Sequence, residues 1–380
     1  MLDEHVEIVT KGDESGNGMI IRLRLPSGLE IMGLPTKNFY GGHWDLGPTW
    51  NWLVLADRPF LVDTGRYGQG RLLADMLATV GLTPADLDFI LISHGHEDHD
   101  GGLAEFLDAG QATVRAHRLY DLLIRVHPDI APPGDKKAFP AKCWHCVMPE
   151  SFYSQFCLEY HQRLPKVRVT PVGDGVDTVS NGFRTYHLPG HSPDCLALLA
   201  GEEALLVGDI VLPEISPWPT NKTLYGHVAE IVSEEYPNPE TIFGLGAYLR
   251  SLKKLNQIAD QRPNLTVLPA HRLYYKDRWN PVELAARVEE LLNHHIDRCS
   301  AILEILTQGP MTPGEIAKQH FPEDLLKGFG RMMATNEMIS HLEFLEESGD
   351  ARALNDGRYE RTGTGNALFE SAINQLQPAY

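Results

Sequence analysis

Short apolar runs separated by turn residues dominate the first part of the chain, from about residue 19 to 65. Four such runs lie at residues 20–25, 29–32, 52–56 and 60–62. Runs of this length, rich in β-branched and aromatic residues and bounded by Gly, Pro, Asn or Asp, are typical of β-strands. The chain is therefore predicted to begin with a set of strands joined by short turns.

From about residue 70 to 300 the pattern changes, and apolar runs of strand length alternate with longer helical ones. Residues 71–80 and 103–107 have helical spacing, whereas 89–92 is a short continuous apolar run that predicts a buried strand. Strands alternating with helices are typical of an α/β arrangement. We therefore predict an α/β first domain over residues 1–300.

Two segments stand apart from this alternation. Residues of about 130–165 contain Pro and Cys clusters and predict an insertion or a lid region. Residues 281–308 predict a long amphipathic helix, with Asn280 as its N-cap and Pro281 in its first turn.

The remaining tail, residues 301–380, is predicted to form a small C-terminal domain. Helical spacing recurs at residues 313–320 and 333–348, and the turn residues at 355–357 predict a hairpin.

Composition narrows the functional classes. The 380 residues are 43% apolar and carry a formal net charge of −18, which disfavours a broad nucleic-acid surface because phosphate binding depends on Lys and Arg. No secretory signal and no apolar run of bilayer-spanning length is present, so we expect no membrane contact. The five cysteines are too sparse for a disulfide framework, and a reducing, cytoplasmic location is expected.

The strongest chemical pattern follows the predicted strand 89–92. His94, His96, Asp98 and His99 stand within six residues. Zinc and similar cations prefer imidazole nitrogen and carboxylate oxygen as ligands. A solvated histidine-rich loop is the alternative explanation, but it does not explain why the pattern recurs further along the chain.

Three later apolar runs also end on residues that bind metals. These residues are His191, Asp209 and His271. Four predicted strands therefore finish on a metal-ligand residue type, which indicates a site built along one edge of a sheet.

The sequence H-x-H-x-D-H at residues 94–99, followed by Gly-His, Gly-Asp and a late His, resembles the metallo-β-lactamase superfamily, and within it the glyoxalase II-like hydrolases. The resemblance covers roughly residues 19–300. It implies a four-layer αββα sandwich with the site at one edge, and two divalent metal ions, zinc in the first place, with iron or manganese as alternatives.

The resemblance also implies a role for each residue. Asp98 would help to orient the nucleophile, and Asp63, which matches an early Asp of the family, would support the site from behind the ligands. The ligand sets would be His94, His96 and His191 for one ion, Asp98, His99 and His271 for the other, and Asp209 as a bridge between them.

The implied reaction is attack of metal-activated water on a small-molecule ester, thioester or lactone. A phosphodiesterase or ribonuclease using the same centre is one alternative. A mononuclear iron enzyme is another, because Cys195 is similar to a residue of the persulfide dioxygenases. Arg272 and His43 are candidate pocket residues, and Arg272 would favour an anionic substrate unless it pairs with a nearby acid.

The segments at residues 294–298 and 302–312 resemble lactamase-like hydrolases that carry a C-terminal winged helix, some of which are endoribonucleases. Residues 301–380 contain six Lys or Arg against twelve Asp or Glu. Because a phosphate-binding surface requires the opposite balance, nucleic acid is not expected as a partner. The tail is interpreted as a packing module or the interface of a homodimer.

A weaker metal pattern lies in the predicted insertion. Its two tight pairs have the spacings of zinc ligands and would form a structural Cys₃His site; the four residues are Cys143, Cys146, Cys157 and His161. Buried thiols and an ordinary helix face are the alternative interpretation.

Overall fold

The computed structural model describes residues 6–38, 45–124, 160, 163–328, 330–363 and 367–380. Five of the predicted site residues lie outside this part of the chain: His43, Cys143, Cys146, Cys157 and His161. The pocket role of His43 and the Cys₃His site therefore stay predictions.

The first half of the chain forms an eight-stranded sheet whose strands follow their sequence order. Pairing is antiparallel from the first strand to the fifth and parallel from the fifth to the eighth. The strands are β1 (Val6–Thr10), β2 (Ile20–Arg24), β3 (Glu30–Thr36), β4 (Thr49–Leu55), β5 (Phe60–Val62), β6 (Phe89–Leu91), β7 (Thr113–His117) and β8 (Val169–Val172). The predicted run of early strands is confirmed.

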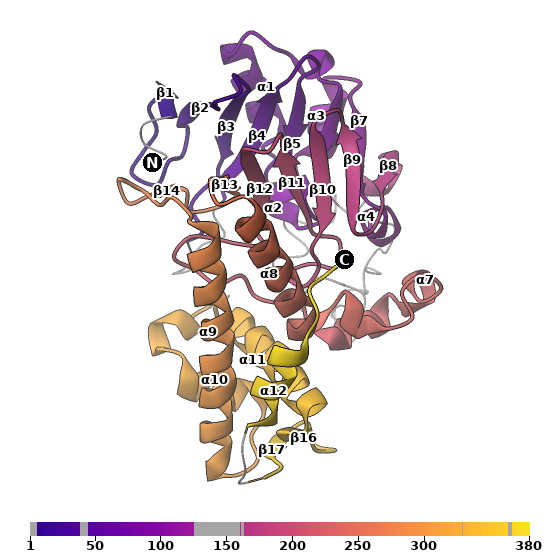
Figure 1. Cartoon of the computed structure of the whole chain (residues 1–380), viewed down its shortest axis with the longest axis vertical. Helices are drawn as coiled ribbons and strands as arrows, with labels where there is room; N and C mark the ends of the chain where they lie inside the picture. The colour runs from indigo at the N-terminus through magenta and orange to yellow at the C-terminus, as the bar shows by residue number, and fades with distance from the viewer. Residues whose placement is uncertain (1–5, 39–44, 125–159, 161–162, 329, 364–366) are drawn as a thin grey trace.

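A second sheet of five strands packs against the first (Figure 1). Its order is β13 (Thr266–Pro269), β12 (Ala204–Gly208), β11 (Leu196–Ala200), β10 (Phe183–His187) and β9 (Val176–Ser180). Only the β12–β13 pair is parallel.

The side chains of each strand alternate between its two faces, and this alternation explains how the layers pack. In β6, Phe89 and Leu91 face the core between the sheets, whereas Ile90 packs under the outer helices. A strand buried on both faces reads as a continuous apolar run. The helices outside the first sheet are α1 (Gly70–Thr79), α3 (Leu103–Asp108) and α4 (Arg118–Leu123), and those outside the second are α8 (Gly244–Gln261) and α9 (Leu284–Ile305). The predicted αββα sandwich is confirmed.

Short elements lie between these helices and strands and in the tail. They are α2 (Glu97–Asp100), α7 (Ala229–Val232), the hairpin β14 (Tyr274–Tyr275) and β15 (Arg278–Trp279), and the 3₁₀ turns Pro84–Asp86, Leu164–Lys166, Lys222–His227, Pro239–Thr241, Leu306–Gln308 and Glu323–Leu326. Among the described residues, no helix combines the length and the hydropathy needed to cross a membrane.

The long helix α9 begins later than predicted. Asn280 does not cap it, because the Asn280 amide donates to the carbonyl of Arg272 at 2.9 Å. The cap is Glu283, whose carboxylate accepts from the amides of Ala285 and Ala286. The prediction of Asn280 and Pro281 as the helix start was therefore wrong, because the β14–β15 region uses the Asn280 side chain.

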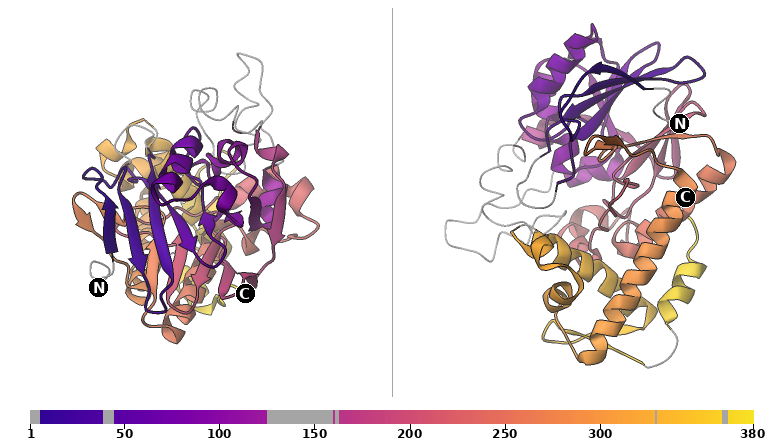
Figure 2. Two further views of the ribbon diagram at one scale, coloured as in Figure 1. Left: turned by 90° about the horizontal axis from the view of Figure 1, so that it is seen from above. Right: turned by 90° about the vertical axis from the view of Figure 1, so that its left-hand side faces the viewer.

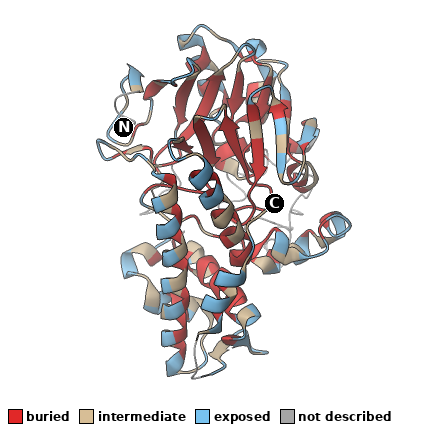
Figure 3. Cartoon of the chain, viewed as in Figure 1, coloured by how far each residue is buried: buried red, intermediate tan, exposed pale blue. Residues whose placement is uncertain are grey.

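The tail consists of α10 (Pro313–His320), α11 (Gly330–Ser348), the hairpin β16 (Ala351–Ala353) and β17 (Tyr359–Arg361), and α12 (Leu368–Gln375). The predicted helices and hairpin are present. Helix α11 packs on α8 and α9 (Figure 2). Buried residues continue from the second sheet into the tail (Figure 3), and their apolar side chains belong to one cluster. The winged-helix subgroup and a domain boundary near residue 300 stay predictions.

Candidate metal centre

Strands from both sheets bring the predicted ligands together. His94 follows β6 of the first sheet, whereas His191, Asp209 and His271 follow β10, β12 and β13 of the second. The four side chains are buried. Each of these residues therefore comes shortly after a strand, as predicted, although His191 lies in the turn beyond β10 rather than at its end.

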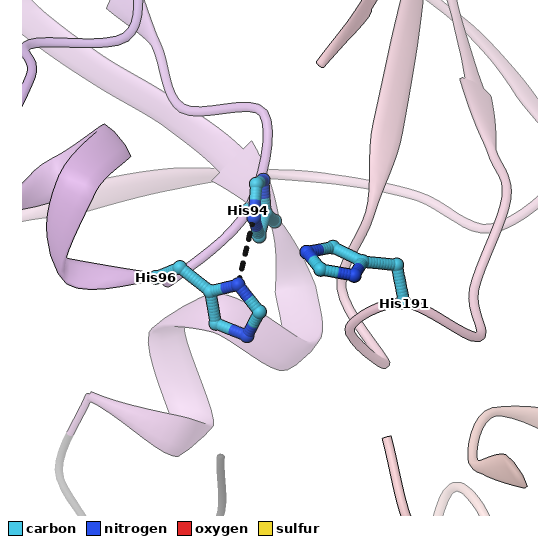
Figure 4. Close-up of side chains that lie close together, drawn as sticks. All are labelled: His94, His96 and His191. Carbon is cyan, nitrogen blue, oxygen red and sulfur yellow. Dashed lines mark hydrogen bonds between the residues drawn. The ribbon is translucent and has the colours of Figure 1, made fainter. Parts of the chain in front are cut away.

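One group consists of three imidazoles (Figure 4). The His94 Nε2 and His96 Nδ1 atoms are 3.0 Å apart, and the His191 ring lies 4.7 Å from the His96 ring and 5.1 Å from that of His94. Burial, with a smaller contribution from His191, lowers the pKa of His96 to about 3. Burial also lowers the pKa of His94 and of His191, which favours the neutral form that binds a metal.

A second group adjoins it and contains Asp98, His99, Asp209 and His271. The His271 Nε2 atom lies 3.3 Å from an oxygen of Asp98 and 3.3 Å from Oδ1 of Asp209. The other Asp209 oxygen, Oδ2, lies 3.6 Å from Nε2 of His191, which belongs to the first group. Asp209 thus faces both groups, with one oxygen toward each.

The unpaired ring nitrogens of these two groups fit a divalent cation. The Nε2 atoms of His99, His191 and His271 are buried, and within the described part of the chain they have no hydrogen-bond partner. Burying a polar atom without a partner is costly. Imidazole and carboxylate ligands at these positions suit zinc and similar ions.

Charge also indicates that the group can exchange protons for a cation. Burial opposes ionisation of Asp209, but His271 and His99 hold its pKa well below the usual value. Burial likewise opposes protonation of His271, yet Asp209 and Asp98 raise its pKa to about 9. Metal ions bind the neutral form of imidazole, so binding of a cation at His271 would release a proton.

Asp63 orients the ligands from behind. Its carboxylate accepts from the amide and hydroxyl of Ser93, each at 2.7 Å, and from Nδ1 of His99 at 2.9 Å. Because the Ser93 hydroxyl donates to Asp63, its oxygen can accept from Nδ1 of His94 at 3.0 Å. Asp63 has a φ of +64°, a strained conformation of the kind found at functional sites.

Backbone carbonyls orient two further imidazoles. His191 Nδ1 donates to the carbonyl of Trp218 at 2.9 Å, and His271 Nδ1 to that of Pro48 at 3.2 Å. When Nδ1 carries the hydrogen, Nε2 presents its lone pair toward the centre. Sequence reasoning missed both carbonyls, since a backbone acceptor leaves no residue pattern.

Asn38 and Asp194 were also missed. The Asn38 amide donates to Oδ2 of Asp98 at 2.8 Å, and Asp194 accepts from the amide of Gly95 at 2.8 Å. Asn38 lies 60 residues from Asp98 in the chain, so no local spacing identifies it.

Replacing Asn38 by alanine should lower kcat/KM roughly tenfold, because second partners that orient a ligand typically contribute 10- to 100-fold. The unfolding transition should shift little by comparison. Steady-state kinetics on a substrate found in the screen proposed below would measure the effect, with the exposed Asn264→Ala as control. Equal kinetics for both variants would show that Asn38 does not orient Asp98.

Gly190 precedes His191 at a position that admits only glycine. Its φ is +135°, and a Cβ there would lie 2.3 Å from Cα of Tyr248. Gly190→Ala should therefore lower the free energy of unfolding by about 3 kcal/mol, from strain and overlap together. Gly182→Ala is the matched control: its φ is +80° but the space is open, so about 1 kcal/mol is expected. Equal losses in urea unfolding would contradict the close approach.

Arg272 has protein partners of its own. Its guanidinium donates to the carbonyl of Asp45, lies 3.8 Å from the Glu214 carboxylate and stacks 3.9 Å from the centre of the Tyr275 ring. This matches the alternative in which Arg272 has a structural role. Cys195 is buried in the apolar cluster of the second sheet and belongs to neither ligand group.

Comparison with known proteins agrees with this geometry. The chain is 25% identical to the "Beta-lactamase-like protein 2 homolog" of Drosophila melanogaster over 79% of its own length and 82% of the relative's. It is 24% identical to the "Probable metallo-hydrolase YqjP" of Bacillus subtilis, over 78% and 86%.

Among solved structures, a metallo-beta-lactamase family protein from Thermus thermophilus superposes with a TM-score of 0.64 and 26% identity, over 87% of this chain and 98% of that one. A beta-lactamase domain protein from Burkholderia ambifaria shares the fold at a TM-score of 0.62 and 18% identity, over 95% and 98%. The profile of the metallo-beta-lactamase superfamily matches residues 44–271. The chain therefore belongs to the metallo-β-lactamase superfamily and is a metal-dependent hydrolase.

Proposed function

We propose that the chain holds two zinc ions and uses them to hydrolyse a small-molecule ester, thioester or lactone. The position of Asp209 supports the binding of two ions. One of its oxygens lies 3.6 Å from His191 and the other 3.3 Å from His271. A carboxylate placed in this way can bridge two ions.

In this proposal His94, His96 and His191 hold the first ion, and Asp98, His99 and His271 hold the second. Two bound ions would lower the pKa of a water molecule and polarise the carbonyl that it attacks. The protein's part is to keep the inner ring nitrogens aimed inward, which are Nδ1 of His96 and Nε2 of the other four histidines. Asp98, held by Asn38 and next to His271, is placed to orient the attacking water.

Charge supports a carbonyl substrate over a nucleic acid. The net charge is −18, and the guanidinium of Arg272, the candidate for binding an anion, is engaged by Asp45 and Glu214. A phosphodiesterase on polyanionic RNA would need a basic surface. The iron dioxygenase alternative loses its support, because Cys195 lies in the apolar core.

Metal analysis of single-ligand variants tests the number of ions. His94→Ala and His271→Ala should each lose about one zinc relative to the unmodified enzyme, as each set would lack one of its ligands. If either variant kept the full metal content, the two-ion assignment would be wrong.

A substrate screen tests the reaction. Acyl-CoA thioesters, lactones and bis-p-nitrophenyl phosphate would be offered to the zinc-loaded enzyme. Turnover of a thioester or lactone, absent from His271→Ala, is the expected result. Turnover of the phosphodiester alone would favour the nuclease alternative.

A further inference from the structure

The chain between β12 and α8 contacts one of the candidate metal ligands directly, through residues 218–223. The Trp218 carbonyl accepts from Nδ1 of His191 at 2.9 Å. The Thr220 hydroxyl donates to the His191 carbonyl, and the Thr220 amide donates to the Gly190 carbonyl at 2.7 Å. Segment 218–223 therefore fixes both the ring and the backbone of His191.

Helix α11 of the C-terminal tail, labelled in Figure 1, holds the other end of this segment. One carboxylate oxygen of Glu343 accepts from the amide of Lys222 at 2.7 Å, and the other accepts from the amide of Thr223 at 2.9 Å. The side-chain amide of Asn221 donates to Oδ1 of Asn336 at 3.1 Å. Each pair of partners is more than 110 residues apart in the chain, so only the fold brings them together.

The contacts of Glu343 are buried, and they satisfy groups on both sides. Glu343 is 4% exposed, and a buried carboxylate without partners is costly. Lys222 and Thr223 supply the first two amides of the 3₁₀ turn Lys222–His227, and amides at the start of a helical turn have no acceptor within it. Hydrogen bonds from N–H groups to a carboxylate are also stronger than those between neutral groups. The tail therefore fixes the start of this turn firmly.

We propose that Glu343 and Asn336 are positioning residues for the first metal ion. By holding segment 218–223 in place, they keep the Trp218 carbonyl against His191. An acceptor for Nδ1 of a histidine ligand sets the tautomer and the direction of the ring. The C-terminal tail would then contribute to the hydrolytic site itself. This inference rests on the proposed assignment of His191 to the first ion.

Glu343→Gln is the informative variant, because it keeps the size of the side chain but leaves one of the two amides without an acceptor. Loss of a group that orients a ligand typically lowers metal affinity 10- to 100-fold, and Glu343 acts through an intervening segment. We therefore expect zinc affinity to fall about tenfold for one ion, measured by competition with a chromogenic chelator.

Glu347→Gln is the matched control on the same helix. It removes the partner of the Lys222 ammonium group but no partner of the backbone amides. Because Glu347 is exposed and ion pairs at the surface contribute little, its zinc affinity should equal that of the unmodified protein.

A spectroscopic readout distinguishes positioning from a general loss of stability. With cobalt(II) in place of zinc, the visible absorption of the bound metal reports the geometry of its ligands. The spectrum should change in Glu343→Gln and in Thr220→Val, which removes the hydroxyl that donates to His191. It should return in Thr220→Ser, which restores that hydroxyl. A plain loss of stability would lower Tm and leave the spectrum unchanged.

Two further variants complete the test. Asn336→Ala, which removes the acceptor of Asn221, should lower zinc affinity in the same way and serves if Glu343→Gln does not fold. Equal zinc affinity and equal cobalt spectra in Glu343→Gln and Glu347→Gln would overturn the proposal, whatever the change in Tm. His191→Ala should lose about one zinc. Full metal content in His191→Ala would instead show that the ligand assignment is wrong, and the positioning role would fall with it.

Discussion

Asp209→Ala should abolish hydrolysis, with kcat/KM reduced by about 10⁴-fold or more, the range seen when a central catalytic group is removed. Asp209 is the residue that touches both ligand groups, through His191 on one side and His271 on the other. Without the carboxylate, the positive charge of two neighbouring ions would lose its shared counter-charge. Zinc content should fall together with activity, measured by mass spectrometry and steady-state kinetics.

Two companion variants sharpen this test. Asp209→Asn keeps the shape of the side chain but removes the negative charge, so it should lose nearly as much activity as the alanine variant. Asp260→Ala, on the exposed face of α8, should behave like the unmodified protein. Full metal content and full activity in Asp209→Ala would show that Asp209 does not bridge two ions.

Asp63→Ala should lower both the free energy of unfolding and the affinity for zinc. The loss leaves three donors without their acceptor: the amide and hydroxyl of Ser93 and Nδ1 of His99. Unsatisfied buried donors cost roughly 1–3 kcal/mol each, so a loss of about 3 kcal/mol in unfolding free energy is expected even if the Ser93 hydroxyl rotates. Zinc affinity should fall about 10- to 100-fold, because His99 would lose the partner that orients it.

Asparagine and glycine at the same position separate the two contributions of Asp63. Asp63→Asn tolerates a φ of +64° and keeps one acceptor oxygen, so it should recover part of the stability. Asp63→Gly relieves the backbone strain but restores no acceptor, so its zinc affinity should stay as low as that of the alanine variant. Urea unfolding and competition with a chromogenic chelator would measure both. An alanine variant as stable as the unmodified protein would show that the three bonds contribute little.

The fold was legible because the inner strands of both sheets, such as β5, β6 and β11, are buried on both faces. Runs such as Phe89–Leu91 are continuous in apolar residues, and the helices between them keep their own spacing. The same regularity located four of the candidate metal residues, since each comes after a predicted strand. His191, Asp209 and His271 were found in this way without any knowledge of how the two sheets pack.

Local reasoning failed where a distant segment competes for a side chain. Asn280 looks like a helix cap, but the carbonyl of Arg272 takes its amide, and Glu283 caps the helix in its place. Arg272 itself left two interpretations open in the sequence. Its contacts with Asp45 and Tyr275 come from loops that only the folded chain brings together.

From the sequence alone, apolar periodicity predicted strands alternating with helices, and the order of strand and ligand singled out the candidate metal residues, because both are local properties. The αββα layers were implied by the resemblance to the metallo-β-lactamase superfamily. Only the tertiary structure decided which partners orient these residues. Asn38 and the Pro48 carbonyl belong to this second kind. Each joins segments far apart in the chain, and such contacts depend on how two sheets pack rather than on any spacing along one of them.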